Sequence, residues 1–270
     1  MSKASLNIAL FVAMVLAQRC DAQDSEATRF RDQIESRGAS VETIGVPGQF
    51  LAGDYPPPFC IHLSKTWGRH PISELNNELV RGIEIASDTD LTKKAFDELR
   101  SFEHLKWLSV DFEDRTWDVN TIGKIASLWS LTINHKWLDD VQLESLSMLS
   151  NLEQLSIENS RLSRHAATIL KKDFRLMRLE LKNNELEAPI SDIVPPSVRT
   201  LILRGVTFSE GDVHYVAKMK SLYILDIRHC QISNESIEEI KRDGGMKLLL
   251  SGEWTGQEDG IEGELWLRDR

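Results

Sequence analysis

Few side chains in this sequence have the types and spacing that catalysis needs. The sequence contains seven histidines and three cysteines. In the weakly patterned N-terminal part, the only suggestive residues are Cys60, His62 and His70, a thiol and two imidazoles of the kind that nucleophilic catalysis uses. The sequence has no H-E-x-x-H, C-x-x-C, G-x-S-x-G or G-x-x-x-x-G-K, the motifs that hold zinc, expose a serine or cradle a phosphate. We therefore expect a protein that is not an enzyme and has no catalytic residues, metal site or cofactor.

The charge balance argues against nucleic acid as the ligand. Asp and Glu number 42 against 32 Lys and Arg, which gives a formal net charge of −10 at pH 7. A protein that binds nucleic acid generally presents a basic surface to the phosphates. With 41% hydrophobic and 27% charged residues, the composition instead indicates a folded, soluble protein.

The N-terminus has the three parts of a secretory signal peptide. Lys3 supplies the positive charge, residues 4–17 form an apolar run, and Cys20-Asp21-Ala22 is a small-x-small cleavage site. The run is shorter than the roughly 20 residues of a membrane helix. We expect a secreted or periplasmic protein that does not insert into the membrane once the signal is cleaved. The alternative is an uncleaved membrane anchor. A lipoprotein acylated at Cys20 is less favoured, because Arg19 is a poor residue immediately before such a cleavage site.

One hydrophobic pattern recurs through the middle of the chain. Residues 176–186 read L-x-x-L-x-L-x-x-N-x-L. Units in the same frame, 22 to 25 residues apart, begin at Val80, Leu105, Leu128, Leu152, Leu176, Val198 and Leu222. Two fainter units flank them, one around Ile61 and Leu63 and one around Leu248 and Leu250. Each unit would leave an apolar face that only its neighbours can cover, which predicts a stack of repeats.

This pattern resembles that of leucine-rich-repeat proteins of the secreted bacterial type. The resemblance covers about Val80 to Leu250 and is strongest from Leu128 to Ile232. It implies an α/β solenoid, with a curved parallel sheet on the concave side and helices or irregular turns on the convex side. Such a resemblance is specific for the fold and uninformative about the function.

The segments outside the repeats are predicted to cap or extend the solenoid. Residues 25–37 are predicted to form an amphipathic helix that ends at Gly38, and a strand follows at Val41–Ile44. The predicted division is a signal peptide (1–22), an N-terminal cap with a Pro-rich spacer (23–57), the solenoid (58–250), and a C-terminal cap or loose tail (251–270). Residues 265–267 would close this tail as an edge strand.

Several return segments between the predicted strands carry helix signals. Thr92 precedes a helical spacing of apolar residues, and Asp139 starts another helix. Ser233 or Ser236 would cap the last helix. In contrast, residues 188–197 contain three prolines, which argue against a regular helix there.

The asparagine position of the repeat departs from the family pattern in most units. It is occupied in order by Asp88, Glu113, Lys136, Ser160, Asn184, Val206 and Cys230. Glu113 and Lys136 could not be buried there unpaired, so we expect a bulge or a shift in register between residues 112 and 138. We interpret Cys230 as a small apolar substitute in a buried turn. Cys60 and Cys230 should be free thiols, because seven repeats would separate them by about 30 Å.

The binding residues of such a solenoid are expected between the inward-turned leucines, on the concave strands. Aromatic side chains gather there in the N-terminal half and basic ones in the C-terminal half. The predicted partner-binding residues are Trp107, Phe112, Trp129, His135, Arg178, Lys182, Arg204, Arg228 and His229. The two histidines would lie roughly 19 Å apart, too far to share a metal ion. For any single residue, the alternative is a side chain that only keeps the sheet soluble.

The function that these patterns favour is a non-catalytic binding module that contacts a protein through the concave face. The aromatic half would anchor the partner, and the basic half would attract an acidic patch on it. A regulatory or accessory subunit of an extracytoplasmic enzyme complex is the alternative. An enzyme in its own right ranks third and would have to use Cys60, His62 and His70. The sequence predicts nothing about the oligomeric state.

Overall fold

The computed structural model describes residues 26–43, 59–67, 70–113, 119–136, 138–243 and 245–249. The predicted signal peptide, Pro-rich spacer and C-terminal tail lie outside these residues. Across the described ranges, no helix has both the length and the apolar character that crossing a membrane requires.

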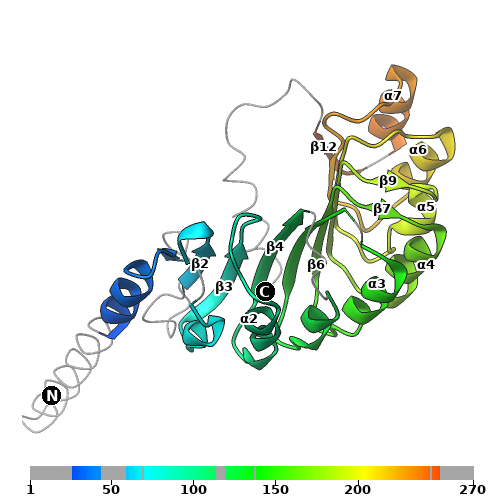
Figure 1. The fold of residues 1–270 in the computed structure, drawn as a ribbon. Helices are drawn as coiled ribbons and strands as arrows, with labels where there is room; N and C mark the ends of the chain where they lie inside the picture. Colours follow the sequence, from blue (N-terminus) through cyan, green and yellow to red (C-terminus); the bar gives the residue numbers. More distant parts are fainter. Residues whose placement is uncertain are drawn as a thin grey trace, which may run out of the picture.

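A ten-stranded sheet organises the chain, and its strands lie side by side in sequence order, apart from the short strands β7 and β9 (Figure 1). The strands are β1 (Ser40–Thr43), β2 (Phe59–Leu63), β3 (Val80–Ile85), β4 (Trp107–Glu113), β5 (Ser130–His135), β6 (Gln154–Glu158), β8 (Arg178–Lys182), β10 (Thr200–Arg204), β11 (Ile224–Asp226) and β12 (Lys247–Leu249). Among the described strands, β1 alone is antiparallel to its neighbour. The described chain is therefore a leucine-rich-repeat solenoid, as the sequence predicts.

Equivalent leucines of successive repeats stack directly on one another. Leu155 pairs with Leu179, which pairs with Leu201 and then Leu225. These side chains are at most 1% exposed and belong to one contiguous core. Because alternate residues of a strand face opposite sides, burial of these leucines turns the residues between them outward.

The return segments cover the outer side of the curved sheet (Figure 1). They contain η1 (Lys65–Trp67), η2 (Ile72–Leu75), α2 (Lys93–Asp97), η3 (Glu98–Ser101), η4 (Val119–Lys124), α3 (Asp140–Ser147), α4 (Arg164–Asp173), α5 (Ile190–Ile193), α6 (Glu210–Ala217) and α7 (Asn234–Asp243). A two-stranded sheet is formed by β7 (Arg161–Leu162) and β9 (Glu185–Leu186). In the sequence, each of these strands lies between a strand of the main sheet and the helix that follows it. The predicted caps Thr92 and Asp139 each accept a bond from a backbone N–H of the first turn. The proline-rich return contains only the single turn α5.

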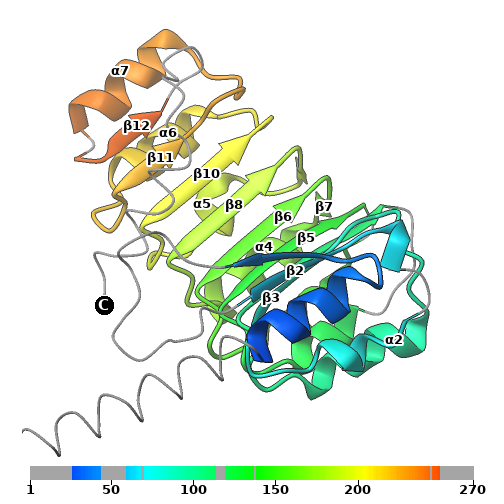
Figure 2. The same cartoon turned by 90° about the vertical axis from the view of Figure 1, so that its left-hand side faces the viewer.

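The helix predicted before Gly38 is present at the N-terminal end of the described chain. Residues 26–35 are helical, and Gly38 follows with φ +90°. A Cβ at Gly38 would lie 2.4 Å from the carbonyl oxygen of Thr66, so only glycine fits there. Ile34 is fully buried, and the ring of Phe30 stacks on Phe59 of β2 at 6.2 Å. Figure 2 shows this helix (blue) beside the first strands of the sheet.

The asparagine position supplies hydrogen bonds between repeats. Asn184 Nδ2 donates to the Ile157 carbonyl at 2.7 Å, and Ser160 Oγ donates to the His135 carbonyl at 2.6 Å. Cys230 Sγ lies 3.1 Å from the Leu203 carbonyl. We interpret Cys230 from the sequence as a small apolar substitute in a buried turn, whereas it is only half-buried and its thiol donates to a backbone carbonyl. It and Cys60 are free thiols, as predicted.

Strands β4 and β5 continue further past the L-x-L segment than the neighbouring strands do, and this changes two predicted positions. Their register shifts between Asp111 and Glu113, which confirms the irregularity expected there. Because the strands continue in alternation, Phe112 and His135 turn inward, with 0% and 2% of their surface exposed. Their rings pack edge to face at 5.2 Å. The prediction that these two side chains contact a partner on the concave face is therefore wrong.

Candidate functional site

The outward-turned residues form three rows across the sheet, because parallel strands in register place paired residues on the same side. We call central row the middle residues of the L-x-L segments: His62, Glu84, Ser109, Thr132, Ser156, Glu180, Ile202 and Asp226. The leading row, two residues earlier, contains Trp107, Ser130, Gln154, Arg178, Thr200, Ile224 and Lys247. The trailing row, two residues later, contains Asp111, Asn134, Glu158, Lys182 and Arg204.

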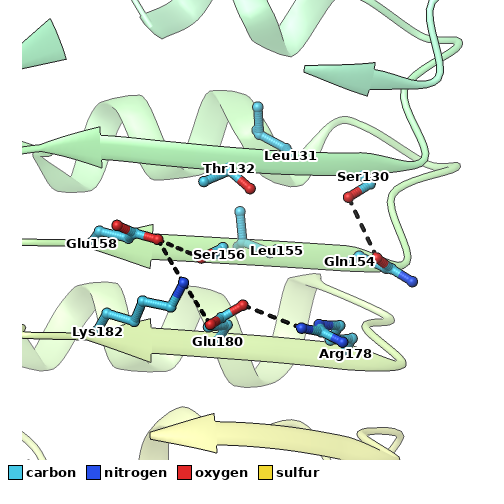
Figure 3. Close-up of a pocket in the computed structure, with 10 residues that line it drawn as sticks. All are labelled: Ser130, Leu131, Thr132, Gln154, Leu155, Ser156, Glu158, Arg178, Glu180 and Lys182. Atoms are coloured by element: carbon cyan, nitrogen blue, oxygen red, sulfur yellow. Dashed lines mark hydrogen bonds and ion pairs between the residues drawn. The ribbon is translucent and has the colours of Figure 1, made fainter. Parts of the chain in front are cut away.

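A shallow hollow of about 270 Å³ opens on this surface over β5, β6 and β8. Its lining residues are drawn in Figure 3: the hydroxyl side chains of β5 and β6 lie beside the long charged side chains of β8, and Glu158 of β6 lies next to Lys182. Ser130 Oγ donates to Gln154 Oε1 at 3.4 Å within it. The hollow exists because Thr132 and Ser156 are small where the next strand carries Glu180.

Lys182 is the centre of a charge network at the rim of the hollow. Its Nζ lies 2.7 Å from Glu180 Oε1 and 3.0 Å from Glu158 Oε1, and Arg178 Nη2 lies 3.5 Å from Glu180 Oε2 (Figure 3). Burial alone would lower the pKa of Lys182, but the hydrogen bonds and charges of Glu180 and Glu158 outweigh burial and raise it. The ammonium group is therefore held charged and positioned by two strands.

A second network surrounds Asp226, whose side chain is only 2% exposed. Arg228 Nη2 lies 2.6 Å from its Oδ2 and Nε lies 2.9 Å from its Oδ1, while Arg204 Nη2 lies 3.4 Å from Oδ2. Burial would raise the pKa of Asp226, but the bonds from Arg228 and the charges of both arginines lower it. Arg204 and Arg228 are thus structural partners of a buried carboxylate as well as surface cations.

The predicted binding residues divide into three groups. Arg178, Lys182, Arg204 and Arg228 lie in or beside the outward rows, as expected, but share their charge with Glu158, Glu180 and Asp226. Trp107 and Trp129 are half-buried at the starts of β4 and β5, and His229 is exposed in the turn after β11. Phe112 and His135 belong to the core, so the aromatic half of the face is reduced to the two tryptophans.

Two of the residues considered for catalysis at the N-terminal end, Cys60 and His62, lie beside carboxylates of neighbouring strands. His62 Nδ1 lies 2.7 Å from Glu84 Oε2, and its Nε2 lies 3.2 Å from Glu42 Oε2. Burial, followed by the charges of Glu84 and Glu42, raises the pKa of Cys60 to about 12. A thiol with that pKa is protonated at neutral pH and is a poor nucleophile. The described residues hold no group of three or more metal-ligating side chains.

The hydroxyl-lined hollow is the part of the site that the sequence did not predict. Ser130, Thr132, Gln154 and Ser156 line it, whereas most of the predicted binding residues come from positions at the two ends of the L-x-L segments. The sequence does contain a signal for the hollow. The middle residue of the L-x-L segment is Ser or Thr in β4–β6 and changes to Glu, Ile and Asp in β8–β11.

The chain matches no protein-family model and no curated protein sequence. Among solved structures it is similar to internalin C2 from Listeria monocytogenes, with 19% sequence identity and a TM-score of 0.45 over 67% of this chain and 74% of that one. It is also similar to the internalin InlF from the same species, with 16% identity and a TM-score of 0.43 over 66% of this chain and 63% of that one. The repeat fold itself is established by the strand register of this chain.

Proposed function

We propose that this leucine-rich-repeat solenoid is a non-catalytic binding module that holds a protein partner on its concave face. The observation that carries the proposal is the continuity of the three outward rows. From β4 to β10 the register keeps all three rows on one side of a single sheet, and the leading and central rows continue to β11. Such a surface can contact many residues of a partner at once.

The size and chemistry of the surface favour a protein over a small molecule. A pocket for a small ligand usually encloses about 300–1,000 Å³, whereas the hollow here is about 270 Å³ and open to solvent. Six strand spacings of about 4.8 Å separate β4 from β12, so the face is roughly 29 Å long. It combines half-buried tryptophan, hydroxyl groups and ordered ion pairs, a mixture that is usual in protein interfaces.

The charge of the face supports a partner with an acidic patch. Among the described outward residues from β8 to β12, the cations Arg178, Lys182, Arg204, Arg228 and Lys247 outnumber the carboxylates Glu180 and Asp226. We also propose that the protein acts outside the cytoplasm, on the strength of the signal-peptide pattern in residues 1–22. The partner is then sought among extracytoplasmic proteins.

The same Thr-to-Arg substitution, made once on the concave face and once on the outer helices, tests whether the concave face binds the partner. Thr132→Arg places a long side chain in the hollow, and Thr168→Arg places the same side chain on the exposed surface of α4. A partner captured by the full chain from the host is purified, and its Kd for each variant is measured by calorimetry. We expect Thr132→Arg to weaken binding at least about tenfold, because it blocks complementarity at the centre of the face.

The control variant should bind the partner as the unmodified chain does. Circular dichroism and thermal unfolding establish that both variants are folded. Retained affinity in Thr132→Arg, or an equal loss in Thr168→Arg, would exclude the hollow as the binding surface.

A further inference from the structure

The hollow over β5, β6 and β8 has a polar lining whose formal charges balance. Eight of its ten lining residues have hydrogen-bonding side chains, and the other two are Leu131 and Leu155. The charged residues of the lining are two carboxylates and two cations: Glu158, Glu180, Arg178 and Lys182. These charges already pair with one another across β6 and β8 (Figure 3). The hollow therefore offers hydrogen bonds without a net charge.

This balance disfavours a charged group in the hollow. Such a group would either enter without a partner or take a carboxylate or a cation from an existing pair, and both cost free energy. A wholly apolar group would fit no better, because it would cover hydroxyl and amide groups without bonding to them. The group that fits the hollow is therefore uncharged and forms hydrogen bonds.

The lining supplies donors and acceptors in several directions. Ser130 Oγ donates to Gln154 Oε1 at 3.4 Å, a bond that does not use the two N–H groups of the Gln154 amide. Ser156 Oγ reaches Glu158 Oε1 only at 3.5 Å. The hydroxyl of Thr132 and that of Ser156 can each donate and accept. A ring with hydroxyl groups around its edge matches such a lining more fully than a single amide does.

The size of the hollow and a neighbouring aromatic side chain also favour a sugar ring. About 270 Å³ lies just below the roughly 300–1,000 Å³ of pockets for drug-sized ligands, which limits the hollow to one ring. Trp107 occupies the leading-row position beside Ser130, one strand spacing of about 4.8 Å away. An indole is a large apolar surface with a polar edge, and a sugar ring has an apolar C–H face that can pack on it.

We infer that the hollow binds one uncharged sugar ring. Hydroxyl groups of the sugar bond to Thr132, Gln154 and Ser156, and the carboxylate of Glu158 accepts a further bond. The inference rests on the proposed function, because it assigns the sugar to the protein partner that covers the rest of the concave face. The partner is accordingly a glycoprotein.

Titration of simple glycosides into the full-length chain tests the hollow. The probes are the methyl glycosides of glucose, galactose, mannose and N-acetylglucosamine, and binding is measured by saturation-transfer difference NMR. We expect at least one of them to bind. Thr132→Val should weaken its binding about tenfold, because the variant keeps the shape of the side chain and removes the hydroxyl group. The matched control Thr168→Val makes the same change at an exposed position of α4 and should bind as the unmodified chain does.

Charged versions of the same ring test the argument from charge balance. The methyl glycosides of glucuronic acid and glucosamine should bind at least about tenfold more weakly than the neutral ones, since each brings a charge into a balanced lining. Three results would overturn the inference: no neutral glycoside binds, Thr132→Val binds as well as the unmodified chain, or a charged ring binds more tightly than every neutral one.

The source of the sugar is tested on the partner itself. Enzymatic removal of sugars from the captured partner should weaken its binding to the unmodified chain about tenfold, through the same lost hydrogen bonds. Unchanged affinity would contradict the assignment of the sugar to the partner.

The two proposals can fail separately. If Thr132→Arg loses the partner while no glycoside binds, the inference fails and the proposed function stands. If glycosides bind in a way that depends on Thr132 while Thr132→Arg keeps the partner, the proposed function fails, and the hollow is a sugar site that the partner does not use.

Discussion

Asp226 shows why a charged side chain on a binding face need not be a binding residue. Its carboxylate is almost fully buried, and Arg228 bonds to both of its oxygens. Removing one partner of a buried ion pair leaves the other charge without compensation, which is strongly destabilising. Substitutions of Arg228 would therefore change folding before they changed binding, and Thr132 is the better residue with which to test the face.

His135 is a titratable side chain that lies in the core. It is 2% exposed and packs against Phe112. Burial lowers its pKa below the usual value of 6.5, and the charge of Asp139 opposes this more weakly. Folding therefore favours the neutral imidazole over the imidazolium.

This burial predicts how stability depends on pH. An unfolded histidine binds a proton near pH 6.5, whereas folded His135 does not bind one until the pH falls through its lower pKa. Its neutral form thus contributes fully above about pH 6.5, and the free energy of unfolding falls as the pH drops below that value towards the lower pKa of the folded state. In urea titrations at several pH values, His135→Phe should show a smaller fall than the unmodified chain. Identical pH profiles for the two proteins would exclude His135 as the source.

At the scale of elements, the turn after each strand decides which side chains reach the surface. In four successive units the residue before the asparagine position has positive φ: Asn159, Asn183, Gly205 and His229. A left-handed residue there ends the strand, so the side chains beyond it no longer alternate. The β4 and β5 units have no described residue of this kind at the equivalent positions, and their strands run on through Phe112 and His135.

Replacement of glycine by alanine at two positions tests the importance of this turn, because we expect the two replacements to change stability in different ways. Gly205 has φ +69°, and a Cβ there would lie 2.7 Å from Asn183 Oδ1. Gly205→Ala should lower the free energy of unfolding by about 1–2 kcal/mol, because left-handed backbone is strained for alanine. Gly211 lies in α6, where a Cβ meets only Ser209 Oγ at 3.8 Å. Gly211→Ala should leave stability unchanged or raise it by up to about 1 kcal/mol through helix propensity.

Chemical denaturation of the two variants supplies the measurement. A loss in Gly211→Ala as large as that in Gly205→Ala would show that the cost arises from something other than the left-handed turn.

At the scale of the whole molecule, each repeat contacts mainly its two neighbours. Strand pairs and adjacent return helices follow the order of the sequence along the described chain. Stability in such an array is approximately a sum over repeats and the interfaces between them. A defect at one end should therefore weaken that end first.

Ile34 offers a test of this behaviour, since it is fully buried in the N-terminal cap. Ile34→Ala should lower the local free energy of unfolding by about 3 kcal/mol, through lost apolar burial and the cavity left behind. Hydrogen exchange followed by mass spectrometry should show reduced protection in β1, β2 and β3 and unchanged protection in β8, β10 and β11. An equal loss of protection in all of these strands would indicate a single cooperative unit.

The sequence by itself determined the repeat and the stacking that the repeat requires. Inward leucines such as Leu155 and Leu179 recur in a fixed frame, and only stacked parallel strands bury them all. The N-terminal cap, the caps Thr92 and Asp139 and the free thiols could be predicted from equally simple signals. The irregularity near Glu113 could also be predicted, because a carboxylate cannot be buried unpaired.

The tertiary structure alone decided which side chains of the predicted face reach solvent and which charges remain for a partner. Strand length at β4 and β5 depends on packing between neighbouring units, so periodicity could not show that Phe112 and His135 turn inward. The pairing of Lys182 with Glu158 joins two strands, and that of Arg204 with Asp226 joins two others. Such pairs depend on register and rotamer across strands, which no pattern within one repeat specifies.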